Sequence, residues 1–368
     1  MIKIYDISLP PKSIEYANDA IQSGWISSIG KYTELASELL SSLCGVNHAL
    51  LTNNGTSATH LLVSIVKEFY PEYKNIILPS SCYVAAYNSV LYEQYHTISC
   101  VDISTKTWNM SIDNVPDSSI VFAVHNLGNI INVPKLQEDH NCLVIEDNCE
   151  GLFGSYNNVP SGSKSLASSL SFFGNKNIST GEGGALLTNN TDLYDFALKL
   201  RGQGQTETRY IHDILGNNFR MTNIQAAILL GQLESFEEIK SLKENVFNQY
   251  RSNLKNCETA VLQQPEENTT HSNWMLGVRF KCLENYKKAE EFFLECGIET
   301  RPMFYSYHKH GYINASGPHK NSDLINQQVV IFPSYPTLST NDIDYICDKI
   351  YSFSSQIFWE WADKRDLI

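Results

Sequence analysis

The chain has 368 residues, of which 42% are hydrophobic and 18% are charged, so it can bury a large core. Lys and Arg number 27 against 40 Asp and Glu, which gives a formal net charge of −13. This acidic balance excludes a broad nucleic-acid interface and binding to an anionic membrane surface. No apolar run is long enough for a membrane span and no secretory signal pattern is visible, so we expect a cytoplasmic protein.

Short apolar runs alternate with helical patterns over roughly residues 45–200. Strands are predicted at residues 49–52 and 75–79, followed by helices at 57–69 and 83–92. Further strands are predicted at residues 96–101, 120–125, 142–146, 170–173 and 184–187. This alternation is typical of parallel βαβ units in a buried sheet.

A second, smaller unit follows a long helical pattern at residues 223–243. A strand is predicted at 274–280, a helix at 287–296 and a last helix at 341–353. We therefore expect an α/β fold with two domains. The large domain covers 1–240 and the smaller α+β domain covers 241–368, and the N-terminal segment could pack on the smaller one.

The first candidate site is Asn54-Gly55-Thr56-Ser57, which lies between a predicted strand and a predicted helix. Glycine permits close backbone approach, and hydroxyl groups at a helix N-terminus suit a phosphate. The same pattern also fits a plain helix cap made by Thr56 or Ser57. The pattern alone favours the cap.

The second candidate is the apolar strand Val144-Ile145-Glu146-Asp147, which ends in two acids. The carboxyl ends of strands form the ligand crevice of an open parallel sheet. A carboxylate there could pair with a cationic group of a ligand. A helix cap is an equally good interpretation of the two acids.

The strongest candidate is the stretch from Ser171 to Gly184, which reads SFFGNKNISTGEGG. An apolar strand delivers one lysine, Lys176, into a loop of glycines and small residues. A solvated surface lysine is the ordinary alternative. The glycines instead indicate a backbone packed close to a bulky group, where Lys176 could form an imine.

Other chemistries lack their patterns, because the dinucleotide, P-loop, zinc-protease and nucleophile-elbow motifs are all missing. His308, His310 and His319 lie close together in the sequence. We see no Cys or acidic companion at ligand spacing, so we expect no metal site. The pair Ser163-Lys164 is interpreted as a solvated loop.

The three candidate stretches, in this order, resemble the DegT/DnrJ/StrS family of sugar-nucleotide aminotransferases, which use pyridoxal phosphate. The likeness extends to residues 25–32, 220–227 and 299–305 with His308, so it spans nearly the whole chain. It is greatest to the perosamine-forming members, with viosamine-forming members close. The resemblance implies a fold type I aminotransferase with a mostly parallel sheet in its large domain, working as a homodimer with shared active sites.

The resemblance also implies the catalytic roles. Lys176 would form an imine with pyridoxal phosphate and shuttle protons between the cofactor and the sugar carbon. Asp147 would keep the pyridine nitrogen protonated, which makes the ring an electron sink. Glu150, where many relatives carry Gln or His, would lie near the same ring.

The remaining implied roles concern binding of the cofactor and substrate. Tyr83 would stack on the ring. Thr56, Ser57 and Ser171 would hold the phosphate, together with Asn223 from the neighbouring subunit. Trp25, Arg220 and His308 would line the sugar-nucleotide pocket. Asn126-Leu127-Gly128 stands where relatives often show Leu-Tyr-Gly, so the local sugar contact is expected to differ.

The expected reaction moves an amino group from glutamate to C4 of a nucleotide-linked 4-keto-6-deoxyhexose. Some relatives carry His in place of the lysine and act as dehydratases, so Lys176 favours amino transfer. Two alternatives stay open at this point. One is a C3 or a UDP- or dTDP-sugar aminotransferase, and the other is a non-catalytic regulator on the same fold.

Overall fold

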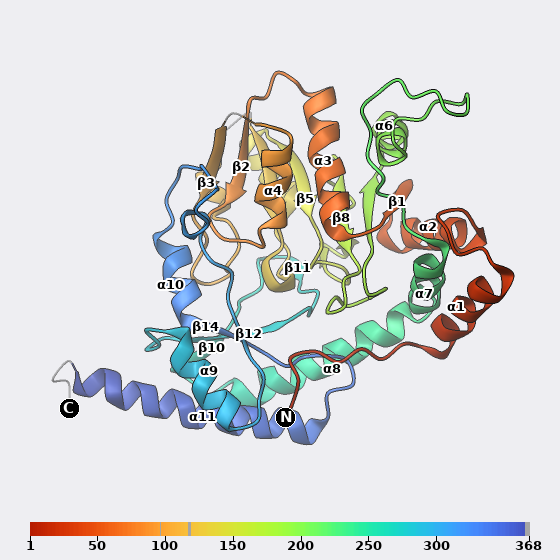
Figure 1. Ribbon diagram of the computed structural model, residues 1–368. Helices are drawn as coiled ribbons and strands as arrows, with labels where there is room; N and C mark the ends of the chain where they lie inside the picture. Colours follow the sequence, from red (N-terminus) through yellow and green to blue (C-terminus); the bar gives the residue numbers. More distant parts are fainter. Residues whose placement is uncertain (96, 117–118, 365–368) are drawn as a thin grey trace.

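A seven-stranded sheet forms the centre of the computed structural model, which describes residues 1–95, 97–116 and 119–364 (Figure 1). The strand order is β1-β9-β8-β5-β4-β2-β3. The strands are β1 (His48–Thr52), β2 (Asn75–Pro79), β3 (Thr97–Val101), β4 (Ile120–Val124), β5 (Leu143–Asp147), β8 (Ser168–Ser171) and β9 (Gly184–Thr188). In this sheet only β9 is antiparallel to its neighbours, which confirms the mostly parallel sheet. The predicted strand at 96–101 begins at His96, which lies outside the described residues.

Both faces of this sheet are covered, and most residues of its strands are buried. On β4, Phe122 packs into one core cluster and Val121 into another, as the alternation of a strand requires. The first cluster includes residues of α3 and α6, and the second includes residues of α5. The helices of this unit are α3 (Gly55–Phe69), α4 (Ala85–Tyr92), α5 (Val133–His140) and α6 (Thr191–Arg201).

Three further helices, α1 (Pro11–Ser23), α2 (Lys31–Cys44) and α7 (Asn223–Leu233), pack together beside β1 (Figure 1). The prediction of one helix over 223–243 is wrong, since α7 ends at Leu233 and α8 (Phe236–Leu254) begins after a break. At the break the Ser235 N–H bonds to the carbonyl of Gln232, and the Ser235 hydroxyl bonds to the carbonyl of Gly231. A serine that bonds to the preceding turn in this way ends the regular helical ladder.

The C-terminal part forms a second sheet, with the strand order β10-β12-β14-β13. Its strands are β10 (Ala260–Leu262), β12 (Leu276–Phe280), β13 (Arg301–Pro302) and β14 (Val329–Phe332), and its helices are α9 (Tyr286–Glu295), α10 (Lys320–Gln328) and α11 (Thr340–Asp363). Aromatic rings of Phe280, Phe293 and Phe332 fill its core. Helix α11 continues beyond the predicted end at residue 353 because buried Ile357 extends its apolar face.

The smaller elements are β6 (Ser155–Tyr156), β7 (Val159–Pro160), β11 (Thr269–Thr270), η1 (Ile112–Asn114), η2 (Asn126–Gly128) and η3 (Tyr307–Lys309). Helix α8 passes from the core that holds Ile239 to the core that holds Val246. We therefore keep the division into 1–240 and 241–368 as a proposal. Ile2 pairs with Ile298, so the start of the chain lies on the C-terminal unit.

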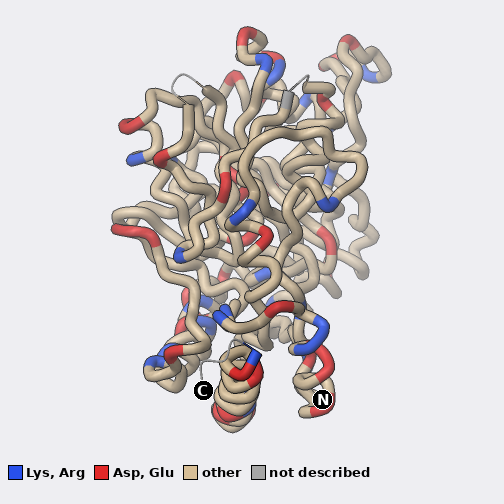
Figure 2. The backbone as a smooth tube through the Cα atoms, turned by 90° about the vertical axis from the view of Figure 1, so that its left-hand side faces the viewer, with Lys and Arg blue, Asp and Glu red and all other residues tan. Residues whose placement is uncertain are grey.

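The composition speaks against a membrane-spanning helix and against a continuous basic surface, and the described residues agree with it. No helix in the described ranges is both long and apolar enough to cross a membrane. Lys and Arg alternate with Asp and Glu along the chain trace in Figure 2, without one continuous basic stretch. This distribution offers no broad cationic surface for a nucleic-acid backbone in that view.

The parallel strands bring their carboxyl ends to one edge of the central sheet, where ligands bind in folds of this kind. Thr52, Pro79, Asp147 and Ser171 are the last residues of four of these strands. The candidate residues that follow these strands in the sequence therefore meet at this edge.

Candidate active site

The turn that enters α3 lies at this edge of the sheet. The Asn54 side chain caps the helix by accepting a hydrogen bond of 2.8 Å from the Ser57 N–H. The prediction of a cap by Thr56 or Ser57 is therefore wrong, because Asn54 precedes the first helical residue and performs this role. Thr56 is exposed and Ser57 is buried.

Two glycines allow this turn to lie directly against the end of β8. A Cβ on Gly55 would stand 2.6 Å from the Cβ of Ser171, and a Cβ on Gly184 would stand 2.5 Å from the carbonyl oxygen of Asn54. Only glycine fits such distances. The approach brings Ser171 beside the α3 N-terminus that carries Thr56 and Ser57, a setting that favours an anion.

Lys176 lies in the loop after β8 and is largely buried. Its Nζ lies 3.6 Å from Oε1 of Glu150 and 3.9 Å from the ring centre of Trp274. The Tyr5 hydroxyl donates to the Lys176 carbonyl at 2.7 Å, and the indole N–H of Trp274 donates to the Asn175 carbonyl at 2.8 Å. The loop is thus held by two residues, Tyr5 and Trp274, that lie far from it in the sequence.

Sequence reasoning missed both of these residues. Trp274 was interpreted only as the start of a strand, and Tyr5 belongs to no motif. No local pattern could have identified either residue, because their role depends on the C-terminal unit and the N-terminal segment reaching the Lys176 loop.

Asp147 and Glu150 are the carboxylates that share this buried region with Lys176. Oδ1 of Asp147 accepts from the Cys149 N–H at 3.1 Å, and Oε2 of Glu150 accepts from the Leu127 N–H at 2.8 Å. Burial raises the pKa of Glu150 to about 7; the Lys176 charge acts against this rise, and the Asp147 charge adds to it. Glu150 can therefore gain or lose a proton near neutral pH.

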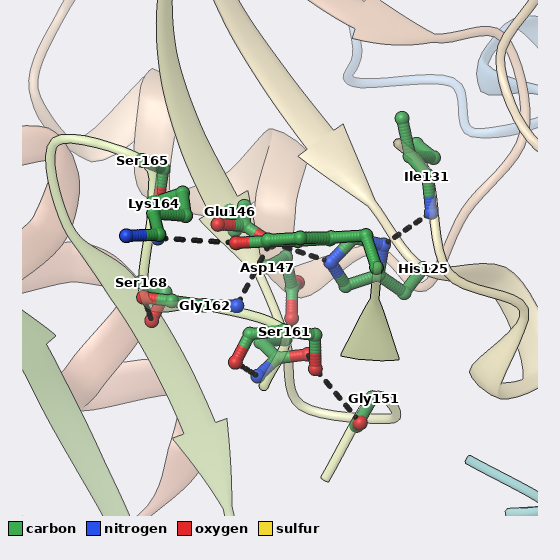
Figure 3. Close-up of polar contacts among 12 residues, drawn as sticks. His125, Ile131, Glu146, Asp147, Gly151, Ser161, Gly162, Lys164, Ser165 and Ser168 are labelled. Carbon is green, nitrogen blue, oxygen red and sulfur yellow. Dashed lines mark hydrogen bonds and ion pairs between the residues drawn. The ribbon is translucent and has the colours of Figure 1, made fainter. Parts of the chain in front are cut away.

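Glu146 has a different task, because neighbouring side chains on a strand point to opposite faces. Figure 3 shows its carboxylate directed toward His125 and Gly162. Glu146 Oε2 lies 2.8 Å from His125 Nε2 and accepts from the Gly162 N–H at 3.0 Å. His125 Nδ1 accepts from the Ile131 N–H, so the ring proton lies on Nε2 and is donated to Glu146. This buried pair joins β4 to β5 and leaves Asp147 as the strand-end acid of the site.

Asn223 makes contacts within its own chain, and its role at a partner's phosphate stays a prediction. Its side chain is only 1% exposed, donates to the Trp25 carbonyl at 2.7 Å and accepts from the Tyr32 N–H at 3.0 Å. A Cβ on Gly30 would stand 2.3 Å from its amide carbon. Asn223 is thus held by the segment from Trp25 to Tyr32 of its own chain.

Three further predicted residues, Tyr83, Arg220 and His308, have other contacts. Tyr83 is 58% exposed after β2, before the start of α4, with its ring centre 6.0 Å from that of Phe304. Arg220 pairs with Thr52 through a backbone bridge beside the α3 turn. The His308 ring packs on His319, with its Nε2 3.6 Å from Asp323.

Replacing Glu150 by glutamine tests its raised pKa. An unfolded Glu binds a proton only below pH 4.5, whereas folded Glu150 keeps it up to about pH 7. Its contribution to stability is therefore complete at low pH and is lost as the pH rises to 7. In urea unfolding, Glu150→Gln should gain stability relative to the wild type between pH 5 and pH 8. An equal difference at both pH values would contradict the raised pKa.

Replacing Asn223 by alanine tests its role within its own chain. The Tyr32 N–H and the Trp25 carbonyl would lose their partner, so unfolding free energy should fall by about 1–3 kcal/mol. Asn218→Ala is the matched control, because this asparagine is exposed and should change stability by less than about 0.5 kcal/mol. Equal urea midpoints for the two variants would refute the assignment.

Comparison with known proteins adds the family. The model of the DegT/DnrJ/EryC1/StrS aminotransferase family matches residues 9–351. The chain is 32% identical over 364 residues to the GDP-perosamine synthase of Escherichia coli O157:H7, covering 96% of this chain and 99% of that protein. It is 35% identical over 308 residues to the GDP-perosamine synthase of Caulobacter vibrioides, covering 80% and 82%.

Solved structures show the same fold. Helicobacter pylori PseC, an aminotransferase of pseudaminic acid biosynthesis, matches with a TM-score of 0.88 at 23% identity, over 96% of this chain and 99% of that chain. A variant of GDP-4-keto-6-deoxymannose-3-dehydratase (ColD) with bound GDP-perosamine matches with a TM-score of 0.87 at 19% identity, over 95% and 100%. The expected fold type is therefore confirmed, and the chain belongs to the DegT/DnrJ/EryC1/StrS aminotransferase family.

Proposed function

We propose that this protein is a pyridoxal-phosphate-dependent aminotransferase that transfers the amino group of glutamate to C4 of a nucleotide-linked 4-keto-6-deoxyhexose. The observation that carries the proposal is the buried placement of Lys176 beside Glu150, at the sheet edge where Asp147 and Ser171 also end their strands. The relatives named GDP-perosamine synthase support amination at C4 and a GDP-linked substrate.

The residues present fit the cofactor. The α3 N-terminus and Ser171 form a cradle that a Cβ on Gly55 would fill, and a phosphate suits such a helix terminus. Thr56, Ser57 and Ser171 would hold that phosphate. Asp147 supplies a buried carboxylate for the pyridine nitrogen, and Tyr83 an aromatic ring for stacking. When bound, pyridoxal phosphate supplies the aldehyde that takes up the amino group and a ring that accepts electrons.

Each of the buried groups then has a task of its own. Lys176 moves protons with its Nζ, which is close enough to Glu150 for charge pairing. Glu150, with a pKa of about 7, can hold a proton or release it near neutral pH. The Trp274 ring covers one side of Nζ and keeps water from that side.

The substrate groups are expected to lie further out along the same edge. Trp25 and Arg220 are proposed to contact the sugar nucleotide, with the Arg220 guanidinium as a cation for its phosphates or for the glutamate carboxylate. His308 is also proposed to contact the sugar nucleotide. Amination at C3 is the competing outcome, and the position of the new amino group distinguishes the two.

Lys176→Ala tests the catalytic assignment. Loss of a positioned proton-transfer group should lower turnover at least about a hundredfold while the fold is kept. Purified protein would be given glutamate with GDP-, UDP- or dTDP-linked 4-keto-6-deoxyhexose, and the amino sugar followed by mass spectrometry. Lys164→Ala is the control, because this lysine is exposed in a nearby loop and should leave turnover unchanged. Wild-type turnover by Lys176→Ala would refute the assignment, and a wild-type protein without a cofactor absorbance band would favour a non-catalytic regulator.

We further propose that two copies associate through the surface beside α1 and α2, with the active sites near this interface. Ile21, Trp25, Ile26 and Ile29 are each 50–68% exposed there. Apolar side chains gathered in one short segment are costly to leave in water and suit an interface. Trp25 would then contribute to the pocket from the interface side.

Ile29→Glu tests this surface. A charge buried in the proposed apolar interface is costly, so the variant should shift the protein from dimer to monomer in sedimentation analysis. Leu294→Glu is the control, since Leu294 is 58% exposed on α9 and outside the proposed surface. A wild-type monomer, or a dimer that Ile29→Glu leaves intact, would refute the proposed interface.

A further inference from the structure

Three potential metal ligands meet at the start of α10. His308 on η3, His319 just before α10 and Asp323 in its first turn have ligand atoms within 4.8 Å of one another. His319 Nδ1 lies 3.0 Å from Asp323 Oδ2, and His308 Nε2 lies 3.6 Å from Asp323 Oδ1. Sequence reasoning rejected a metal here for lack of an acidic companion. That prediction overlooked Asp323, four residues after His319 and so on the same face of the helix.

The cluster rests on a firm scaffold. The Ser306 hydroxyl donates to Asp323 Oδ1 at 2.8 Å, which orients the carboxylate. Asp102 accepts from the backbone N–H groups of Asn321 and Ser322 and so fixes the first turn of α10. Groups that orient metal ligands in this way raise the affinity of a site.

The two imidazoles are held and accessible at the same time. The Tyr307 ring packs edge-on against both His308 and His319, with ring centres 5.9 and 5.8 Å apart. Side chains of the three candidate ligands are 28–39% exposed, so an ion can enter from solvent.

We propose that His308, His319 and Asp323 form a site for a divalent transition metal such as Zn²⁺, with a water in the remaining position. Two imidazoles and one carboxylate suit ions of this borderline class better than Mg²⁺ or Ca²⁺. The ion joins η3 to α10. Ser306, two residues before His308, pairs with Ser81 through the backbone. A bound ion would therefore also stabilise the segment from Ser81 to Tyr83.

Co²⁺ titration of tag-free, EDTA-treated protein tests the site, with visible absorption as the readout. The wild type should bind one Co²⁺ per chain and develop a d–d spectrum stronger than that of aqueous Co²⁺. His319→Ala and Asp323→Asn should each weaken binding at least about tenfold. His212→Ala is the control, because this exposed histidine lies in another loop and should leave the titration unchanged.

A second readout separates a specific site from loss of folding. Zn²⁺ should raise the thermal midpoint of the wild type and of His212→Ala, and should do so much less for the two ligand variants. Circular dichroism would verify that the variants are folded. A wild type without a saturable Co²⁺ spectrum would overturn the proposal, and so would folded ligand variants that bind Co²⁺ as tightly as the wild type.

Discussion

The site depends on one electrostatic constraint, which is the burial of the Lys176 ammonium group. A buried cation is costly unless a charge or a polarisable group faces it. Glu150 at 3.6 Å and the Trp274 ring at 3.9 Å meet this need from two directions. The raised pKa of Glu150 indicates that burial outweighs the attraction of Lys176. Glu150 can therefore gain or lose a proton near neutral pH beside this ammonium group.

Glycines allow the backbone segments around the site to approach one another closely. Gly55 and Gly184 let the α3 turn lie against Ser171 and Asn54 at distances that any side chain would prevent. A helix N-terminus and a strand end thus share one small space. Gly128, with φ of +90°, permits a similar approach on the other side, where a Cβ would stand 2.9 Å from the Glu150 carbonyl.

Local sequence patterns predicted the elements whose structure depends mainly on neighbouring residues in the sequence. Most strands of the central sheet could be predicted because they are short apolar runs, and Lys176 could be predicted because it follows such a run among glycines. The strand predicted at 170–173 lies instead at Ser168–Ser171, where three of the four residues are serine. The break between α7 and α8 could not be predicted, since it depends on hydrogen bonds of Ser235 inside an otherwise helical pattern. Asn223 was predicted as a free helix-terminal amide, yet the segment from Trp25 to Tyr32 encloses it.

Residues that contact the site or its neighbours from far away in the sequence belong to no local motif, so they could not be predicted. Lys243 is an example. Its side chain is fully buried and has no carboxylate partner among the described residues, and burial lowers its pKa well below the usual value. It donates to the carbonyls of Trp274 and Ser334, at the start of β12 and just after β14. Trp274 in turn bonds to Asn175 and covers Lys176.

This chain of contacts links the core of the C-terminal unit to the Lys176 loop. Tyr5 adds a second link through the Lys176 carbonyl, and its ring lies 5.9 Å from Lys243 Nζ. The geometry around Lys176 is therefore set by three parts of the chain that no single motif contains. Trp274 is a direct link between the two, because its backbone carbonyl accepts from Lys243 and its indole N–H donates to Asn175.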